Sequence, residues 1–449
     1  MFSDAYSPAV ARVSDGMAVK GLAALAGSAG QICESDLAMR RGGACGSAGL
    51  KGVVAVTALA MMEFLSVGPA FGGTIPDFTF GGITIRPYAT DQLDIGGFPS
   101  AEPAHPGTGA VGARLRNGAR VTIRDQVEIG GIWDFGPAPG GPMRLFEGAI
   151  SYTGLKHFRF TVGVFKPSFG LESDEAQGDT VFIERSAIST VTRDLAAGIE
   201  REAVQAETFG DRYHVAVSAT AGTSGPEHDG NQRGMAFRVA GLALKRRDAL
   251  VHLGFSGEWV FRPANDGPDG RSVSFSDTPE GNNGAVSHFL STGSIPARSA
   301  GAFGLEAAVQ WRRLLVQGEA YTIVVNTRSP AVVNTIHYNG WYGMAAYTLV
   351  GSPRKWKARS GAFSDPVCDR RQTVMCDGTG VLEAAARYSR TDLRAPVWSG
   401  GDQKIWTAGL NWYPFDIIRL TLQYQYGRVT GGRSPERFQS VMSMFQIKF

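Results

Sequence analysis

The sequence predicts an all-β protein, a transmembrane antiparallel β-barrel of about 16 strands, with 18 strands as the alternative count. Three observations support this fold. The last thirteen residues alternate in side-chain character and end on Phe449. Similar segments recur along the chain, and the connections between them are alternately short and long, as in a transmembrane barrel. No apolar run reaches the ~18 residues that a membrane-spanning helix needs.

The C-terminal segment, residues 437–449, has the two-residue period of a β-strand. Phe449 and Ile447 fall on one face, and Lys448 and Gln446 fall on the other, because successive side chains of a strand point to opposite sides. A terminal aromatic on such a strand is typical of the closing strand of a lipid-facing wall. Taken alone, the segment also fits an edge strand of a soluble β-domain. Two alternating segments just before it, 404–413 and 417–429, are joined by a short turn and favour the barrel.

Alternation predicts sixteen strands along the chain. They lie near residues 79–94, 113–124, 127–136, 144–153, 158–166, 197–209, 212–222, 234–246, 249–260, 299–312, 314–326, 339–350, 380–391, 404–413, 417–429 and 437–449. With the C-terminus in the periplasm, the long connections 95–112, 167–196 and 261–298 lie outside the cell, and most periplasmic connections are short. Segment 351–379 is an exception, since it is long and periplasmic. One further hairpin within it would raise the count to 18.

The N-terminal part is expected to be removed during export. Arg40, Arg41 and Lys51 precede the apolar run 52–67, and small residues at 68–70 provide a cleavage site. We therefore divide the chain into residues 1–70, a prefix plus secretory signal peptide, and residues 71–449, the barrel. An exported barrel of this kind belongs in the bacterial outer membrane.

Composition and motifs exclude several functional classes. The net charge is +3, so bulk electrostatics give no basis for nucleic-acid binding. We find no His-Glu-x-x-His, Gly-x-Ser-x-Gly or Gly-x-x-x-x-Gly-Lys motif, so no enzymatic activity and no cofactor are predicted.

Two of the four cysteines, Cys368 and Cys376, lie in the part expected to be exported. A disulfide between them is predicted, because the compartment beyond the inner membrane is oxidising. A structural zinc site would need two more ligands nearby, and Asp369 and Asp377 are poor candidates. No metal site is therefore predicted.

Several segments carry a resemblance to a known family. They are the run 160–187, which contains Phe-Lys-Pro-Ser-Phe-Gly-Leu-Glu at 165–172 and the Glu184-Arg185 pair, the runs that begin at Trp341 and Gly380, and Gly-Leu-Asn-Trp-Tyr-Pro at 409–414. Over most of residues 78–449 the chain resembles the phosphate-selective porin O/P family. The resemblance implies a homotrimer of sixteen-stranded barrels that lies in outer-membrane lipid and passes small anionic or polar solutes. It does not establish phosphate as the solute.

Strand 113–124 predicts an arginine ladder on the wall of the lumen. Arg114, Arg116, Arg120 and Arg124 share one parity, opposite to the apolar residues that should face lipid. Such a ladder could pass an anion along by charge-assisted hydrogen bonds, or its members could pair with carboxylates across the lumen. Both interpretations remain open from the sequence. The other pore-lining candidates are Arg159, Lys166, Arg212, Arg387 and Arg419.

The third external loop, 167–196, is expected to fold into the barrel and form the constriction. Its charged candidates are Glu172, Asp174, Glu175, Glu184, Arg185 and Arg193. Acidic residues outnumber basic ones in this loop, which does not fit a strict phosphate funnel. No spaced ligand motif indicates calcium here.

Two functional classes follow from this sequence. The first is a passive, water-filled channel for small solutes with a possible preference for anions. The second is a non-conducting barrel that acts as a receptor, adhesin or anchor. A receptor usually carries a plug domain, and residues 71–78 are too few to form one.

Overall fold

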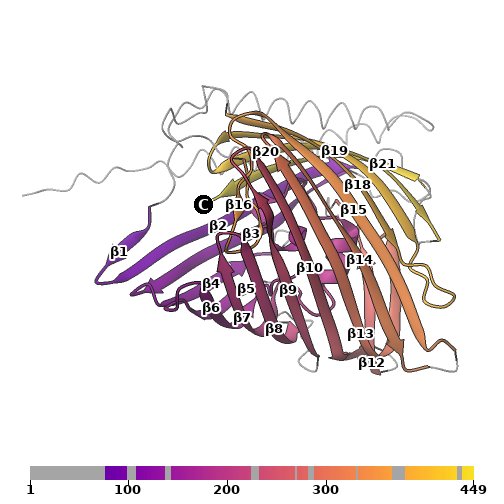
Figure 1. Ribbon diagram of the computed structural model, residues 1–449. Coiled ribbons are helices and arrows are strands. Elements are labelled where there is room, and N and C mark those ends of the chain that lie inside the picture. The colour runs from indigo at the N-terminus through magenta and orange to yellow at the C-terminus, as the bar shows by residue number, and fades with distance from the viewer. Residues whose placement is uncertain are drawn as a thin grey trace, which may run out of the picture. The chain divides into compact units, whose positions relative to one another are not determined.

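The computed structural model describes residues 76–98, 108–136, 143–223, 232–267, 270–281, 288–329, 332–366, 380–431 and 437–449. Sixteen long strands within this part form a closed antiparallel barrel (Figure 1), which confirms the predicted fold and count. The strands are β2 (Ile83–Gly97), β3 (Thr108–Ile123), β4 (Val127–Asp134), β5 (Arg144–Tyr152), β6 (Phe158–Phe165), β7 (Arg201–Gly210), β8 (Tyr213–Thr223), β9 (Arg233–Lys245), β10 (Ala249–Arg262), β13 (Leu290–Trp311), β14 (Leu314–Thr327), β15 (Thr335–Val350), β18 (Val381–Asp392), β19 (Asp402–Phe415), β20 (Ile418–Thr430) and β21 (Arg437–Lys448). The predicted signal peptide lies outside the described residues.

The barrel closes because its first and last strands pair. β2 pairs with β3 on one side and with β21 on the other, where Asp91 lies opposite Ile447. At the end of this seam, Ala89 and Phe449 exchange two backbone hydrogen bonds of 3.1 Å. A closed sheet leaves no unpaired strand edge. This matters in a membrane, because lipid cannot form hydrogen bonds with unpaired backbone N–H and C=O groups.

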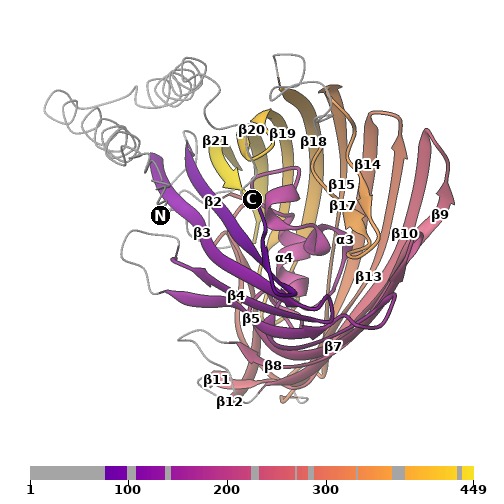
Figure 2. The same ribbon diagram turned by 90° about the vertical axis from the view of Figure 1, so that its left-hand side faces the viewer.

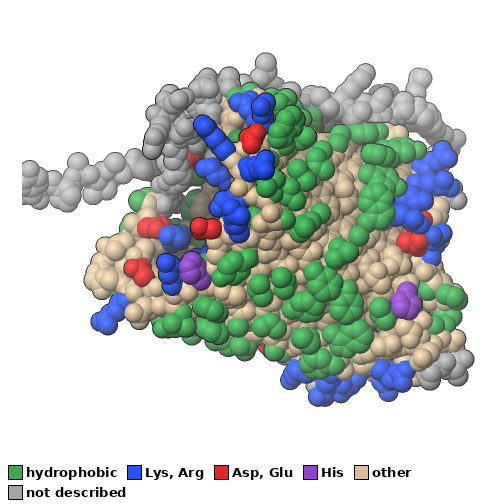
Figure 3. Space-filling view, in the orientation of Figure 1, with side chains coloured by type: hydrophobic (Ala, Val, Ile, Leu, Met, Phe, Trp, Pro, Cys, Tyr) green, Lys and Arg blue, Asp and Glu red, His purple; other side chains and the backbone are tan. Residues whose placement is uncertain are grey.

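Side chains alternate across the wall as the sequence predicts. Trp406 and Tyr424 point outward and are 61% and 44% exposed, whereas Asn411 and Gln423 on the same two strands are fully buried inside. Hydrophobic side chains spread over the outer face in Figure 3. An apolar exterior around a polar interior is the pattern of a barrel that sits in lipid.

Five short strands do not belong to the sixteen. β1 (Phe78–Phe80), β11 (Ala264–Gly267) and β12 (Gly270–Asp277) extend the sheet at its ends. β12 pairs with residues 290–296, so β13 begins at Leu290 rather than at residue 299 as predicted. β16 (Trp356–Lys357) and β17 (Ala362–Phe363) pair only with each other. They lie in the long connection 351–379, so the alternative count of 18 barrel strands is wrong.

All helical turns of the described residues lie in the connection between β6 and β7. They are α3 (Leu171–Asp174), η1 (Gln177–Asp179) and α4 (Ala187–Arg193), and Figure 2 shows α3 and α4 inside the ring of strands. The hydroxyl of Ser186 caps α4 by accepting a hydrogen bond from the backbone N–H of Ser189. In the part of the chain that the structure describes, no helix is long and apolar enough to cross a membrane.

Candidate functional site

The connection 166–200, which we call the inner loop, is fixed to the C-terminal half of the barrel wall. Arg419 donates hydrogen bonds to the carbonyl oxygens of Thr180 and Val181 at 2.6 and 2.8 Å, and Asn411 donates to Val181 at 2.9 Å. On the neighbouring part of the wall, α4 packs against β14, β15 and β18, where Ile188 joins the main apolar core. The inner loop therefore fills one side of the lumen and leaves the other side open.

Two acidic side chains of the inner loop form ion pairs with arginines of the barrel wall. Glu172 forms an ion pair with Arg387 at 3.0 Å, and Asp174 forms one with Arg238 at 2.8 Å. Each guanidinium also binds a second carboxylate, because Arg387 lies 2.7 Å from Glu280 and Arg238 lies 3.0 Å from Glu306. Glu280 follows β12 in another external connection, so two external loops converge on one arginine.

The periplasmic connection after β15 also folds into the lumen, which explains its length. Lys357 of this segment forms an ion pair with Asp179 of the inner loop at 2.8 Å. Arg354 donates to the carbonyl oxygen of Asp179 at 2.5 Å and binds Glu383 of β18 at 2.8 Å. Segments from opposite ends of the barrel thus meet at Asp179. The sequence indicated this only through the unusual length of one periplasmic connection, which we interpreted as a candidate hairpin.

A cavity of about 630 Å³ lies between the inner loop and the opposite wall, β2 to β8. Its charged lining comprises ten basic side chains and eight carboxylates: Arg86, Arg114, Arg116, Arg120, Arg159, Lys166, Arg185, Arg193, Lys357 and Arg359, with Glu128, Glu147, Asp174, Asp179, Glu184, Glu207, Asp277 and Glu280. A space of this size lined by many charged side chains is suitable for water and small solutes. We call this cavity the passage.

Three ladder arginines line the passage, and each one has a carboxylate partner. Arg114 lies 2.5 Å from Glu184, Arg116 lies 2.8 Å from Asp134, and Arg120 lies 2.5 Å from Glu147. Arg159 likewise binds Glu128 at 2.6 Å. Of the two interpretations left open by the sequence, the structure therefore supports pairing. Paired guanidiniums contribute little net charge to the passage.

Two predicted pore-lining residues lie elsewhere. Arg124 is part of the exposed turn between β3 and β4 and has a positive φ of 50°, so it is not the fourth rung of the ladder. Arg212 is exposed in the turn between β7 and β8. Both errors have the same cause, because parity stops predicting direction where a strand bends into a turn.

Arg387 and Arg419 do point inward, but the inner loop covers them. Their side chains are almost completely buried, and both donate hydrogen bonds to the inner loop, Arg387 to Glu172 and Arg419 to Thr180. They therefore anchor the inner loop and do not line the passage. Glu172 and Glu175, two predicted constriction residues, are buried behind the loop in the same way.

Lys166 and Arg185 differ from the other basic residues because backbone oxygens hold them. Lys166 Nζ donates to the carbonyl oxygens of Ser173 and Glu175 at 2.5 and 3.3 Å. Arg185 donates to the carbonyl oxygens of Glu172 and Glu175, both at 2.8 Å, and also binds the side chain of Gln177. No carboxylate of the described residues forms an ion pair with either cation. Neither charge is therefore neutralised by a directly bound carboxylate.

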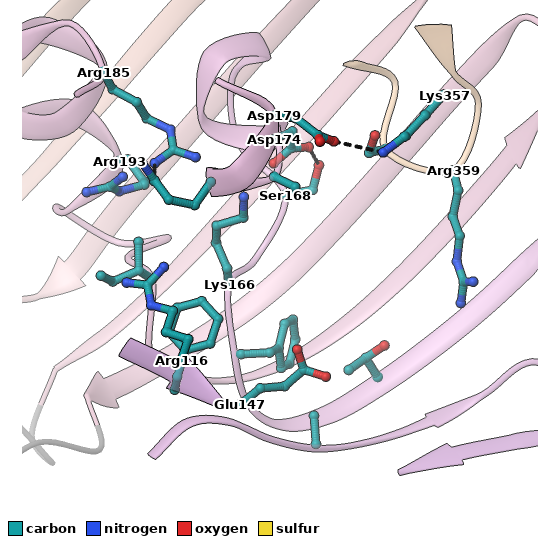
Figure 4. Close-up of a pocket in the computed structure, with 18 of the residues that line it drawn as sticks. Arg116, Glu147, Lys166, Ser168, Asp174, Asp179, Arg185, Arg193, Lys357 and Arg359 are labelled. Carbon is teal, nitrogen blue, oxygen red and sulfur yellow. Dashed lines mark hydrogen bonds and ion pairs between the residues drawn. The ribbon is translucent and has the colours of Figure 1, made fainter. Parts of the chain in front are cut away.

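Arg193 and Arg116, each paired with a carboxylate, lie near these two cations. Figure 4 shows Arg116, Lys166, Arg185 and Arg193 together on one side of the passage, and Lys357 and Arg359 on the other. The partner of Arg193 is Asp194, 2.7 Å away, whose side chain is half exposed to solvent. Lys357 and Arg359 were not predicted as lining residues, and about half of each side chain is exposed.

Burial affects the charge of two groups in the inner loop. Burial, together with the neighbouring guanidiniums of Arg185 and Arg193, lowers the pKa of Lys166 to about 7. Burial raises the pKa of Glu175 to about 8, although the charge of Arg354 opposes this effect. Near neutral pH the Glu175 carboxyl is therefore mostly protonated, and Lys166 carries only part of its positive charge, which becomes complete at lower pH.

The predicted disulfide between Cys368 and Cys376 lies outside the described residues. In the described ranges, no group of three or more His, Cys, Asp or Glu side chains is arranged to hold a metal ion.

A closed sixteen-stranded barrel with a folded-in loop and a charged passage is the architecture of an outer-membrane porin. The chain belongs to the family of phosphate-selective porins O and P, whose model matches residues 136–449. An uncharacterized protein of Caulobacter vibrioides is 27% identical over 374 residues, which cover 78% of this chain and 69% of that protein. The protein is accordingly a porin channel of the bacterial outer membrane.

Solved porin structures share the fold at low sequence identity. In-vitro folded OmpT of Vibrio cholerae is 12% identical, with a TM-score of 0.53, and the match covers 84% of this chain and 100% of that one. OmpF of Salmonella typhi, in a complex with daunomycin, is 11% identical, with a TM-score of 0.52 and coverage of 83% and 100%. These likenesses support the barrel architecture alone.

Proposed function

We propose that the passage conducts small anions in preference to cations, and that the protein acts as a channel and not as an enzyme. One observation carries this proposal. Seven of the eight lining carboxylates form an ion pair with a basic side chain, and two of these seven pair with the same arginine. Lys166 and Arg185, in contrast, donate hydrogen bonds to backbone carbonyl oxygens. Positive charge without a directly paired carboxylate, in a narrow polar passage, raises the local concentration of anions and lowers that of cations.

The spacing of the two cations suits a small oxyanion. Lys166 and Arg185 both donate to the carbonyl oxygen of Glu175, through hydrogen bonds of 3.3 and 2.8 Å. One ion with several acceptor oxygens can therefore contact both cations through charge-assisted hydrogen bonds. Phosphate, the solute in the family name, has this chemistry, as do sulfate and short carboxylates. We propose small oxyanions as the class that passes most readily.

Planar-bilayer recording tests this proposal. With KCl on both sides, we expect single-channel steps, and added potassium phosphate should reduce the chloride current because phosphate occupies the two cations for longer. A barrel that never conducts would instead support the receptor, adhesin or anchor role. Conduction without any effect of phosphate or sulfate would remove the support for an oxyanion site.

The family resemblance also implies a homotrimer, which we retain as a proposal. Sedimentation of the detergent-solubilised protein, corrected for bound detergent, would distinguish one barrel from three. A single barrel at all concentrations would contradict the trimer without affecting the proposal about the passage.

A further inference from the structure

A line of cationic side chains crosses the outer face of the four C-terminal strands. Arg390 of β18 lies directly opposite Lys404 of β19. Lys404 in turn lies opposite Arg428 of β20, which lies opposite Arg437 of β21. Neighbouring strands are about 4.8 Å apart, so the line spans roughly 14 Å. We call these four residues the outer cationic row.

The row faces away from the lumen. Lys404, Arg428 and Arg437 are exposed, whereas the residues that follow them, Ile405 and Val429 among others, are buried on the inner side. In Figure 3, blue side chains gather with red ones among them at the right-hand edge, where the C-terminal strands end in Figure 1. The row is thus separate from the passage and its charges.

Aromatic side chains fix the height of the row in the membrane. Two residues closer to the barrel centre, Tyr388, Trp406 and Tyr426 form a parallel line across three of these strands, β18, β19 and β20. The rings of Tyr388 and Trp406 are 4.6 Å apart, and Trp406 is 61% exposed. Outward Trp and Tyr residues mark the level of the lipid head groups. The cations lie just beyond this level, on the end of the barrel that carries the external connections.

The row lacks enough carboxylates to neutralise it. Arg390 lies 3.0 Å from both Asp392 and Asp402, and Lys404 lies 3.6 Å from Asp402. Nearby Arg394 uses the same two carboxylates. These two acids thus serve three cations at the β18 end of the row.

Arg428 and Arg437, at the other end of the row, form no ion pair with any described residue. Lys404 and Arg428 are direct cross-strand neighbours, as are Arg428 and Arg437. Like charges in such positions repel and destabilise the sheet. An external anion at this end would relieve the repulsion.

We propose that the outer cationic row binds the phosphate groups of outer-leaflet lipid. A phosphate accepts charge-assisted hydrogen bonds from several Arg and Lys side chains at once, and basic clusters at the membrane surface recognise anionic lipid head groups. The lipid source follows from position, because acyl chains that pack on the apolar wall below hold the phosphate at this height. A free ion has no such support.

The test compares two double variants of the full chain in detergent. Arg428→Gln/Arg437→Gln removes the unpaired half of the row, and Arg246→Gln/Arg247→Gln removes two exposed charges from the opposite end of the barrel. Binding of bisphosphorylated lipid A is measured by native mass spectrometry, on protein whose heat-modifiable migration shows that the barrel is folded. We expect affinity to fall about tenfold or more in the row variant and to stay unchanged in the control.

Two further titrations identify the source of the phosphate and need only the wild-type protein. Enzymatically dephosphorylated lipid A should bind about tenfold more weakly, and inorganic phosphate at the concentration of the lipid should displace little of it. Equal binding by the two variants, or equal affinity for both forms of lipid A, would overturn the proposal. Displacement by equimolar inorganic phosphate would also overturn it, because the row would then be a site for free anions.

Discussion

Lys166 and Arg185 share one acceptor, the carbonyl oxygen of Glu175, to which they donate at 3.3 and 2.8 Å. By these two distances, their nitrogens lie no more than about 6 Å apart. Two like charges so close repel each other, and no carboxylate of the described residues forms an ion pair with either one. The inner loop tolerates the pair because several backbone dipoles point at it, and the passage beside it admits ions from water.

Raising the pH should weaken anion preference. Lys166 has a pKa lowered to about 7 by burial, so it loses its positive charge above that pH. Glu175 has a pKa raised to about 8, also by burial, so it gains a negative charge above that value. Both changes make the passage less positive. Reversal potentials should move toward zero as the pH is raised from 6 to 9. In the Lys166→Met variant, only the part of this pH-dependent change that is due to Glu175 should remain. A pH-independent potential would contradict both assignments.

Loss of Arg387 should release the inner loop. Arg387→Leu leaves the buried carboxylates of Glu172 and Glu280 without their cation. We expect this change to lower the free energy of unfolding by about 3–5 kcal/mol. We expect a lower urea midpoint, together with a larger and noisier single-channel conductance as the loop leaves the wall. Arg359→Leu is the control, because that half-exposed guanidinium lies 3.8 Å from its nearest carboxylate. Equal effects of the two substitutions would show that Arg387 is no anchor.

The ladder should contribute little to selectivity. The double variant Arg120→Gln/Glu147→Gln removes one complete ion pair and leaves the net charge of the passage unchanged. Its reversal potential should equal that of the wild type, whereas Arg120→Gln alone should reduce anion preference by exposing Glu147. If the neutral double variant lost selectivity, the guanidinium of Arg120 itself would be acting on the permeating ion.

The last residue should stabilise the closing seam. Deleting Phe449 removes its two backbone hydrogen bonds with Ala89, worth about 1–3 kcal/mol together. We expect a lower urea midpoint and a smaller heat-modifiable fraction after refolding into lipid. Phe449→Tyr, which keeps the backbone bonds and an aromatic ring, should refold like the wild type. A deletion variant with an unchanged midpoint would show that the seam does not depend on this residue.

The strands and their faces were predictable because alternation is a local property of the sequence. The charge distribution of the lumen was not, because it depends on which side chains meet across the barrel. Counted along the chain, the inner loop is acidic, yet the charges of Glu172 and Asp174 are offset by Arg387 and Arg238 on the wall. The cations Lys166 and Arg185 are left facing the passage. Turn residues such as Arg124 were misassigned for a simpler reason, since alternation ends where a strand does.

The anion preference of the passage depends most on the charge of Lys166, and reversing that charge tests its role directly. In a roughly tenfold KCl gradient, with the dilute side at ~0.1 M so that screening stays moderate, the wild-type channel should show an anion-selective reversal potential. Lys166→Glu should abolish that potential or change its sign. Lys156→Glu makes the same change of net charge in an exposed periplasmic turn and should leave the potential unchanged. A folded, conducting Lys166→Glu channel with the wild-type reversal potential would contradict the account.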